Sequence, residues 1–149
     1  LVGSGMAIVF CSPESEEEWE GYFKLRWEML RKLWGHERGS ERGEDEDSSF
    51  HVMAVEGKQI LGVGRMHARE DGVMQIRYMA VAAEGQRRGI GSGVVAALEE
   101  EARRRGALRV QLDSRESAVP FYEKNGYAVV AESYLLWGEI PHFLMVKEL

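Results

Sequence analysis

Apolar residues recur every three or four positions from Trp19 to Trp34, which is the spacing of one helix face. Ser12 or Ser15 can cap the start of this helix, and Gly35 is expected to end it. Arg26 falls on the apolar stripe, where it either snorkels to solvent or meets an acidic partner; we expect it to snorkel. The residues expected to face the core are Trp19, Tyr22, Phe23, Leu30, Leu33 and Trp34.

Two further helices are expected later in the chain. An apolar row at every fourth position predicts a long helix that ends at Gly106, and this row consists of Ile90, Val94, Leu98 and Ala102. Its solvent side is expected to carry glutamate–arginine pairs four residues apart, at 99–103, 100–104 and 101–105. A short helix follows within 117–126, and Pro120 implies that it starts late or is bent.

Short apolar runs between turn signals predict the strands. The turns Gly57-Lys58 and Asp71-Gly72 join three of them into an antiparallel meander over residues 50–82. The other expected strands lie at 7–10, 108–113, 127–136 and 142–149. The element order is therefore β-α-β-β-β-α-β-α-β-β. A strand–helix–strand unit over 73–113 inside this antiparallel run predicts an α/β fold with a mixed sheet and helices on both faces.

Composition and charge limit the class of protein. The chain has 149 residues and a net charge of −6, which fits one globular domain over residues 6–149 and argues against nucleic-acid partners. The opening residues LVGSG (1–5) look like a tag remnant before Met6. No apolar run is long enough to span a membrane, so no membrane partner is expected. The single cysteine, Cys11, suits a cytoplasmic protein, and we expect a packed thiol rather than a nucleophile.

The stretch QRRGIGSG, residues 86–93, places three glycines where a helix is expected to start. Unpaired amides and the helix dipole favour an anion there, and Arg87 and Arg88 add positive charge. A P-loop would need lysine after its glycines, and a dinucleotide fingerprint would need a small residue where Val94 stands. A flexible helix entry without a ligand is the remaining alternative.

Two motifs in this order resemble the GNAT acetyltransferase superfamily. Residues 86–91, QRRGIG, match its Q/R-x-x-G-x-G/A signature, and SAVPFYEKNGY (117–127) is similar to its second motif. The strand order also agrees from Met6 onward. The resemblance implies a GNAT fold, with a central, mostly antiparallel, twisted sheet of about seven strands. The segments 25–47 and 139–145 resemble a bacterial subgroup with poorly defined small-molecule substrates.

In this family the loop binds the pyrophosphate of coenzyme A. The resemblance therefore implies acetyl-CoA as the cosubstrate and no metal ion. The resemblance implies that amides from Arg87 to Ser92 hold the phosphates, with Gln86 opening the turn. The strand before the loop would offer its backbone to the pantetheine arm, with the acetyl carbonyl near the amide of Val81. The implied cofactor-binding residues are Met79, Ala80, Val81, Gln86, Arg87, Arg88, Gly89, Ile90, Gly91, Ser92, Ser114 and Ala118.

Tyr122 matches the tyrosine that family members commonly use as general acid, so it is expected to protonate the departing thiolate. Simple packing against the cofactor is the alternative. The family's usual base is a glutamate, but its position here holds Gln75. His67, Glu84 and His142 are the possible substitutes, and a water relay would serve as well.

The resemblance assigns the acceptor site to residues 34–49 and 137–142, with Trp34, His67 and His142 as candidate substrate residues. The carboxylates of Glu44, Asp45, Glu46 and Asp47 either attract a cationic amine or lie on a solvated loop. The expected activity is acetyl transfer to a primary amine of a small molecule or peptide by direct attack. The alternative is a non-catalytic acyl-CoA-binding sensor or interaction module. Exposed strands of such sheets often pair, which would allow a homodimer.

Overall fold

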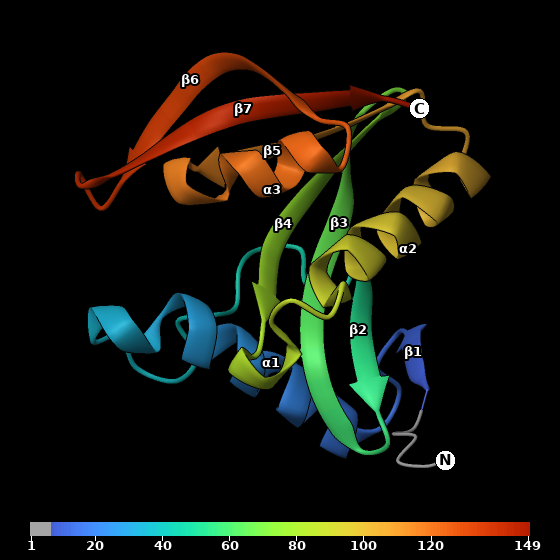
Figure 1. Cartoon of the computed structure of the whole chain (residues 1–149), viewed down its shortest axis with the longest axis vertical. Helices are drawn as coiled ribbons and strands as arrows, with labels where there is room; N and C mark the ends of the chain where they lie inside the picture. Colours follow the sequence, from blue (N-terminus) through green and yellow to red (C-terminus); the bar gives the residue numbers. More distant parts are fainter. Residues whose placement is uncertain (1–6) are drawn as a thin grey trace. The chain divides into compact units, whose positions relative to one another are not determined.

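The structure, a computed structural model, describes residues 7–149 (Figure 1), and the expected tag remnant at residues 1–5 lies outside the described residues. The order of helices and strands is the predicted one. The elements are β1 (Ile8–Cys11), α1 (Glu16–Leu30), η1 (Lys32–Trp34), β2 (Phe50–Glu56), β3 (Gln59–Glu70), β4 (Val73–Val81), η2 (Ala83–Gly85), α2 (Ile90–Arg104), β5 (Arg109–Arg115), η3 (Glu116–Ala118), α3 (Val119–Lys124), β6 (Ala128–Leu136) and β7 (Ile140–Glu148).

The strands form a seven-stranded sheet in the order β1-β2-β3-β4-β5-β7-β6. β1 is antiparallel to β2, and β7 is antiparallel to both β5 and β6. β4 and β5 are parallel, with a register that runs from Val73↔Arg109 to Ile76↔Leu112. The α2 crossover places these two strands side by side, as a strand–helix–strand unit requires. The predicted mixed α/β sheet is confirmed.

The chain divides into two compact units, which are described separately. The first unit contains the residues up to Arg65 together with Tyr78–Leu98, and the second contains Met66–Arg77 together with Glu99–Leu149. The division runs through three elements, β3, β4 and α2, so each of them has one part in the first unit and one part in the second. No helix within residues 7–149 is long and apolar enough to span a membrane.

In the first unit, α1 and α2 cover opposite faces of β3 (Figure 1). Tyr22 and Phe23 of α1 belong to one buried cluster with Val63 of β3. The alternate positions of β3 are glycines: a Cβ on Gly62 would lie 2.5 Å from Ile90, and one on Gly64 would lie 2.7 Å from Val94. Since neighbouring strand residues point to opposite faces, these glycines let α2 approach the sheet closely.

A capping box forms the start of α1, as its sequence predicts, but the helix ends earlier than predicted. The Ser15 side chain accepts a hydrogen bond from the Glu18 amide, and the Glu18 carboxylate accepts one from the Ser15 amide. After Leu30 the chain tightens into the 3-10 turn η1 and reverses at Gly35, with φ of 75°. This turn changes the phase of the stripe, so Leu33 and Trp34 are 85% and 44% exposed instead of buried. Cys11 is also exposed, so its expected packing was wrong.

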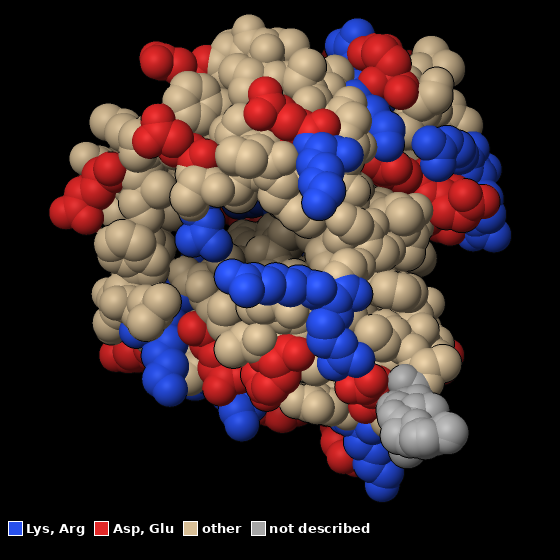
Figure 2. All heavy atoms as spheres, in the orientation of Figure 1, with Lys and Arg blue, Asp and Glu red and all other residues tan. Residues whose placement is uncertain are grey.

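In the second unit, Glu99 of α2 is buried rather than solvent-facing. Tyr127 donates a 2.8 Å hydrogen bond to Glu99 Oε2, and Lys147 Nζ lies 3.0 Å from Oε1. The expected pairing of Glu99 with Arg103 is therefore replaced by contacts with Tyr127 and Lys147. Glu101 pairs with Arg105 as predicted. Figure 2 shows acidic and basic side chains intermixed on the surface beside α2.

Candidate functional site

The loop before α2 turns through left-handed backbone at two residues. Arg87 has φ of 63° and Gly89 has φ of 75°, a region that glycine adopts without steric cost. The Gly93 amide donates to the Gly89 carbonyl at 3.0 Å and begins the helical pattern. The amides of residues 90–92 belong to the first turn of α2, where backbone N–H groups lack intrahelical partners. The loop thus has the backbone geometry of an anion site.

Two side chains tie this loop to its surroundings. Gln86 Nε2 donates to the carbonyl of Val81 at 3.1 Å, which fastens the loop to the end of β4. Arg88 donates two hydrogen bonds to the Glu56 carboxylate of β2, at 3.1 and 2.6 Å. Because Arg88 is engaged in this exposed pair, the loop's attraction for an anion rests mainly on backbone dipoles and Arg87.

The middle of β4 contains a non-glycine residue in left-handed backbone, Tyr78, with φ of 58°. Such a residue inside a strand is a feature of a β-bulge, which redirects the groups that follow it. The register of β4 with β5 ends at Ile76, two residues earlier. Residues 79–81, which were predicted to bind the cofactor, therefore follow the irregular point of the strand.

Tyr122 lies on α3 in the second unit, which also contains the candidates Ser114 of β5 and Ala118 of η3. Its side chain is buried, with ring centroids 4.9 Å from Phe121 and 5.9 Å from Tyr127. Burial raises the pKa of the Tyr122 phenol, and the charge of Arg115 offsets part of this rise. The phenol is therefore protonated at neutral pH, as a proton donor must be.

Gln75 is buried at 2% exposure and belongs to a hydrogen-bonded row of polar side chains. Its Oε1 accepts from Gln111 at 2.8 Å, and its Nε2 donates to Asp113 Oδ2 at 3.3 Å. Gln111 and Asp113 are alternate residues of β5, so they share one face of the sheet. Asp113 was not among the predicted site residues, although alternating polar residues in a strand can signal such a row.

Most of this chain matches a known protein family. The sequence profile described as "Acetyltransferase (GNAT) family" matches residues 19–127, which is most of the chain. The chain belongs to the GNAT acetyltransferase family. It is an acyltransferase by family, and its sheet and helices are those of a GNAT fold.

Individual GNAT relatives cover nearly the whole chain. It is 32% identical to the uncharacterized N-acetyltransferase YjcF of Bacillus subtilis over 135 residues, which are 91% of this chain and 96% of that protein. A crystal structure from Lactobacillus plantarum, provisionally named an N-acetyltransferase, has a TM-score of 0.82 and 24% identity, covering 98% of this chain and 99% of that one. An aminoglycoside 6'-N-acetyltransferase complexed with coenzyme A has a TM-score of 0.75 and 19% identity, covering 96% and 97%. The two structures show that the fold is shared.

The three candidate bases of this GNAT chain have different surroundings. Glu84 is exposed in the first unit and accepts a 3.0 Å hydrogen bond from Gln59. His142 stacks on Tyr134 with centroids 4.5 Å apart, and its Nδ1 lies 3.0 Å from the Ile140 carbonyl. Since a carbonyl only accepts, Nδ1 carries a hydrogen, and in the neutral ring the lone pair is then on Nε2. His67 is half-buried on β3.

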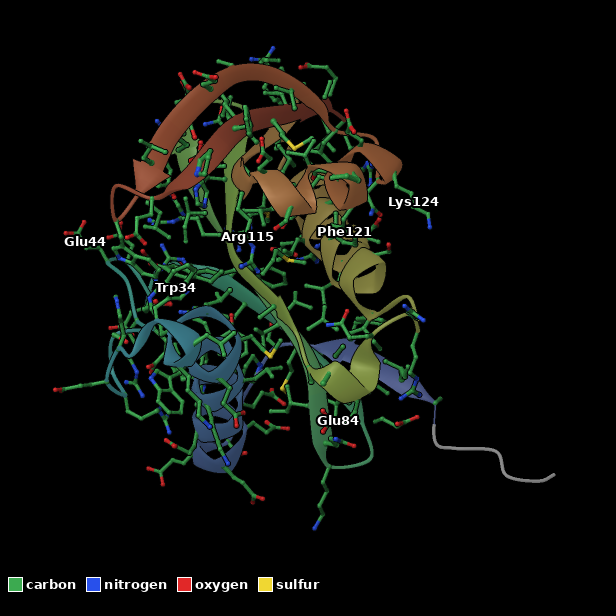
Figure 3. All side chains as sticks on the ribbon, turned by 60° about the vertical axis from the view of Figure 1, so that its left-hand side comes forward. Trp34, Glu44, Glu84, Arg115, Phe121 and Lys124 are labelled. Carbon is green, nitrogen blue, oxygen red and sulfur yellow. The ribbon has the colours of Figure 1, made fainter. Side chains whose placement is uncertain are left out.

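The four carboxylates of residues 44–47 have different surroundings. Glu44, which Figure 3 labels, is exposed on the loop after η1, and Asp45 and Asp47 are exposed as well. Glu46 instead pairs with buried Arg26, with Nη1 and Oε2 2.8 Å apart. Arg26 is 0% exposed, so the expectation that it snorkels was wrong. An arginine on an apolar stripe was the sequence signal for this ion pair.

Among residues 7–149, no cluster of three or more His, Cys, Asp or Glu side chains could hold a metal ion. The predicted site residues are divided between the two compact units. The first unit holds residues 79–81, 86–92, Glu84 and exposed Trp34, and the second holds Ser114, Ala118, Tyr122, His67 and His142.

Proposed function

We propose that the chain is an acetyl-CoA-dependent N-acetyltransferase that acts on a primary amine of a small molecule or peptide. The observation that carries this proposal is the loop at 86–92, where left-handed Arg87 and Gly89 lead directly into the start of α2. A diphosphate group carries the negative charge that such amides bind. Residues 79–81, after the irregular point at Tyr78, would hydrogen-bond the pantetheine arm as an added strand does.

The transfer is a direct attack without an acyl-enzyme. The amine nitrogen bonds to the thioester carbonyl carbon, the carbon–sulfur bond breaks, and the thiolate takes the proton of Tyr122. The attacking nitrogen loses its proton to water or to a base among His67, Glu84 and His142. Burial keeps the Tyr122 phenol protonated at neutral pH, which a proton donor requires. The catalytic unit comprises residues 6–149.

The names of two similar proteins support this activity. The Bacillus subtilis relative is named an N-acetyltransferase, and the aminoglycoside acetyltransferase was crystallised with coenzyme A. A non-catalytic acyl-CoA-binding module is the second candidate. The amide of Gln75, held between Gln111 and Asp113 where the family places a carboxylate base, favours this alternative.

We expect the protein to act in the cytoplasm, without a nucleic-acid or membrane partner. The edge strand β6 exposes Val129, Val130, Tyr134 and Leu135, at 42%, 58%, 46% and 59%. An exposed apolar edge is the surface on which a homodimer would form.

Calorimetry with coenzyme A and a thiol-release assay over a library of amines test the proposal together. An N-acetyltransferase binds acetyl-CoA and releases thiol with at least one amine. Tight binding with no release on any amine would favour the binding module. Absence of binding would contradict both functions.

A further inference from the structure

Three nitrogen atoms surround one carboxylate oxygen in the first unit, two as hydrogen-bond donors and one as an ion-pair partner. Glu46 Oε2 lies 2.8 Å from Arg26 Nη1, 3.1 Å from Arg65 Nη1 and 2.6 Å from the amide of Gly43. Arg26 and Arg65 are 0% and 1% exposed, so this carboxylate partners two guanidinium groups inside the protein. Glu46 thereby fastens its own loop, residues 39–49, to α1 and β3.

Neutral side chains complete the attachment of this loop. His51 Nε2 donates to the carbonyl of Glu46 at 2.7 Å, because a carbonyl can only accept. His51 Nδ1 is 2.8 Å from the Tyr22 hydroxyl, and Arg26 Nη2 donates to that hydroxyl at 3.1 Å. Burial lowers the pKa of His51, so the imidazole is neutral at pH 7. The loop is therefore held by a continuous hydrogen-bonded network.

The same arginines stack on Tyr78 of β4. The Tyr78 ring centroid lies 4.4 Å from the guanidinium carbon of Arg26 and 5.2 Å from that of Arg65. Gly43 of the loop lies against the other end of this ring, since a Cβ added to Gly43 would overlap the Tyr78 hydroxyl. Tyr78 is thus enclosed by the arginines at its face and by the loop at its hydroxyl.

The enclosure matters because Tyr78 has left-handed backbone, with φ of 58°. A bulky residue adopts this region only where its surroundings hold it there. Arg26 and Arg65 form part of these surroundings, and both are placed by Glu46. A change in the loop would therefore reach the backbone of β4 through two contacts, the arginine stack and Gly43.

We propose that loop 39–49 sets the donor-binding form of β4 through Tyr78, so that Glu46, Gly43 and Tyr78 are positioning residues for acetyl-CoA. The inference rests on the proposed function, which assigns the strand after Tyr78 to the pantetheine arm and the loop to the acceptor. Acceptor and donor binding are then thermodynamically linked. An amine that alters the loop changes the affinity for acetyl-CoA, and acetyl-CoA changes the affinity for that amine by the same factor.

A double-mutant cycle in the full chain tests this coupling, with the Kd for coenzyme A measured by calorimetry. Gly43→Ala adds one methyl group against the Tyr78 hydroxyl and is expected to weaken binding by about tenfold. Tyr78→Phe removes the hydroxyl that the added methyl group would overlap, and its own Kd is the reference for the double variant. The double variant is expected to recover most of the lost affinity, which general damage to the loop would not do.

Glu46→Gln gives a second measurement if Gly43→Ala does not fold. It keeps an acceptor for the Gly43 amide and removes the charge that places the arginines, so weaker coenzyme A binding is expected. Exposed Glu44→Gln is the matched control and should bind as the original chain does.

Three outcomes are distinguishable. If Gly43→Ala and Glu46→Gln bind coenzyme A with the same Kd as the original chain, the coupling is overturned and the proposed function stays intact. A loss in Gly43→Ala that Tyr78→Phe does not reduce would overturn the role of Tyr78. No binding by the original chain would overturn the proposed function and this inference with it.

Discussion

Gln75 donates its side-chain amide to the carboxylate of Asp113, with Nε2 and Oδ2 3.3 Å apart on parallel neighbouring strands. This relationship explains why an amide can occupy the position where family members carry a glutamate. A buried glutamine has both a donor and an acceptor. Here its amide nitrogen donates to Asp113, and its Oε1 accepts from Gln111 and, at 3.4 Å, from Arg69. A carboxylate in its place would meet a second carboxylate.

Gln75→Glu is therefore expected to destabilise the protein rather than supply a better base. The like charge of Asp113 raises the folded-state pKa of the new carboxyl group, so the variant loses stability as the pH rises above about 4. We expect a loss of at least about 1 kcal/mol at pH 7 in thermal or urea unfolding.

The double variant Gln75→Glu with Asp113→Asn separates repulsion from poor packing. It replaces the carboxylate pair by a carboxylate and an amide, and it should recover most of the lost stability. An equal loss at acidic and neutral pH, with no recovery in the double variant, would show that repulsion is not the cause.

Tyr122→Phe tests the general acid. Removing a proton donor should lower kcat by about a hundredfold, while the Kd for coenzyme A changes by only a few fold. Steady-state kinetics with an accepted amine and calorimetry give the two values. Tyr127→Phe is the matched control, since it removes a hydroxyl from the neighbouring buried ring, where Glu99 keeps its contact with Lys147. Full turnover in Tyr122→Phe would mean that the thiolate is protonated by another group.

Glu46→Ala is expected to cost about 3–5 kcal/mol of folding free energy, because it leaves two buried guanidinium groups without this carboxylate. Glu44→Ala, on the same loop but exposed, should change stability by less than about 0.5 kcal/mol. Urea unfolding of the two variants at pH 7 provides the comparison. A similar small effect in both would contradict the structural role of Glu46.

The contribution of Glu46 should also depend on pH. Burial alone would raise its pKa, but the Gly43 amide and the charges of Arg26 and Arg65 leave the pKa below its ordinary value. A group with a lowered folded pKa stabilises the protein above its unfolded pKa of about 4.3 and loses this effect as the pH falls. The stability difference between the original chain and Glu46→Gln should therefore shrink on acidification below about pH 4.

The sequence pattern predicted features that depend on neighbours along the chain. Ile90, Val94, Leu98 and Ala102 are all at most 1% exposed, because a four-residue spacing places them on one helix face whatever packs there. The loop of Arg87 and Gly89 was visible for the same reason, since a left-handed turn before a helix has a local glycine signal.

Features that depend on distant contacts were not predictable in this way. Arg26 and Glu46 are 20 residues apart, and nothing local distinguishes Glu46 from Glu44, Asp45 or Asp47. The exposure of Leu33 and Trp34 arises from a tightening of the helix after Leu30, which shifts the apolar phase without a glycine or proline at that point.

Gly93 has a packing role that a substitution can test. A Cβ at this position of α2 would overlap the ring of Phe10 from β1. Alanine normally stabilises a helix interior by about 1 kcal/mol relative to glycine, but here we expect Gly93→Ala to destabilise the protein by about 1–3 kcal/mol. Phe10→Leu shortens the opposing side chain and should return Gly93→Ala toward the stability of Phe10→Leu alone, as measured by thermal unfolding. Greater stability in the single Gly93→Ala variant would mean that the ring moves aside without cost.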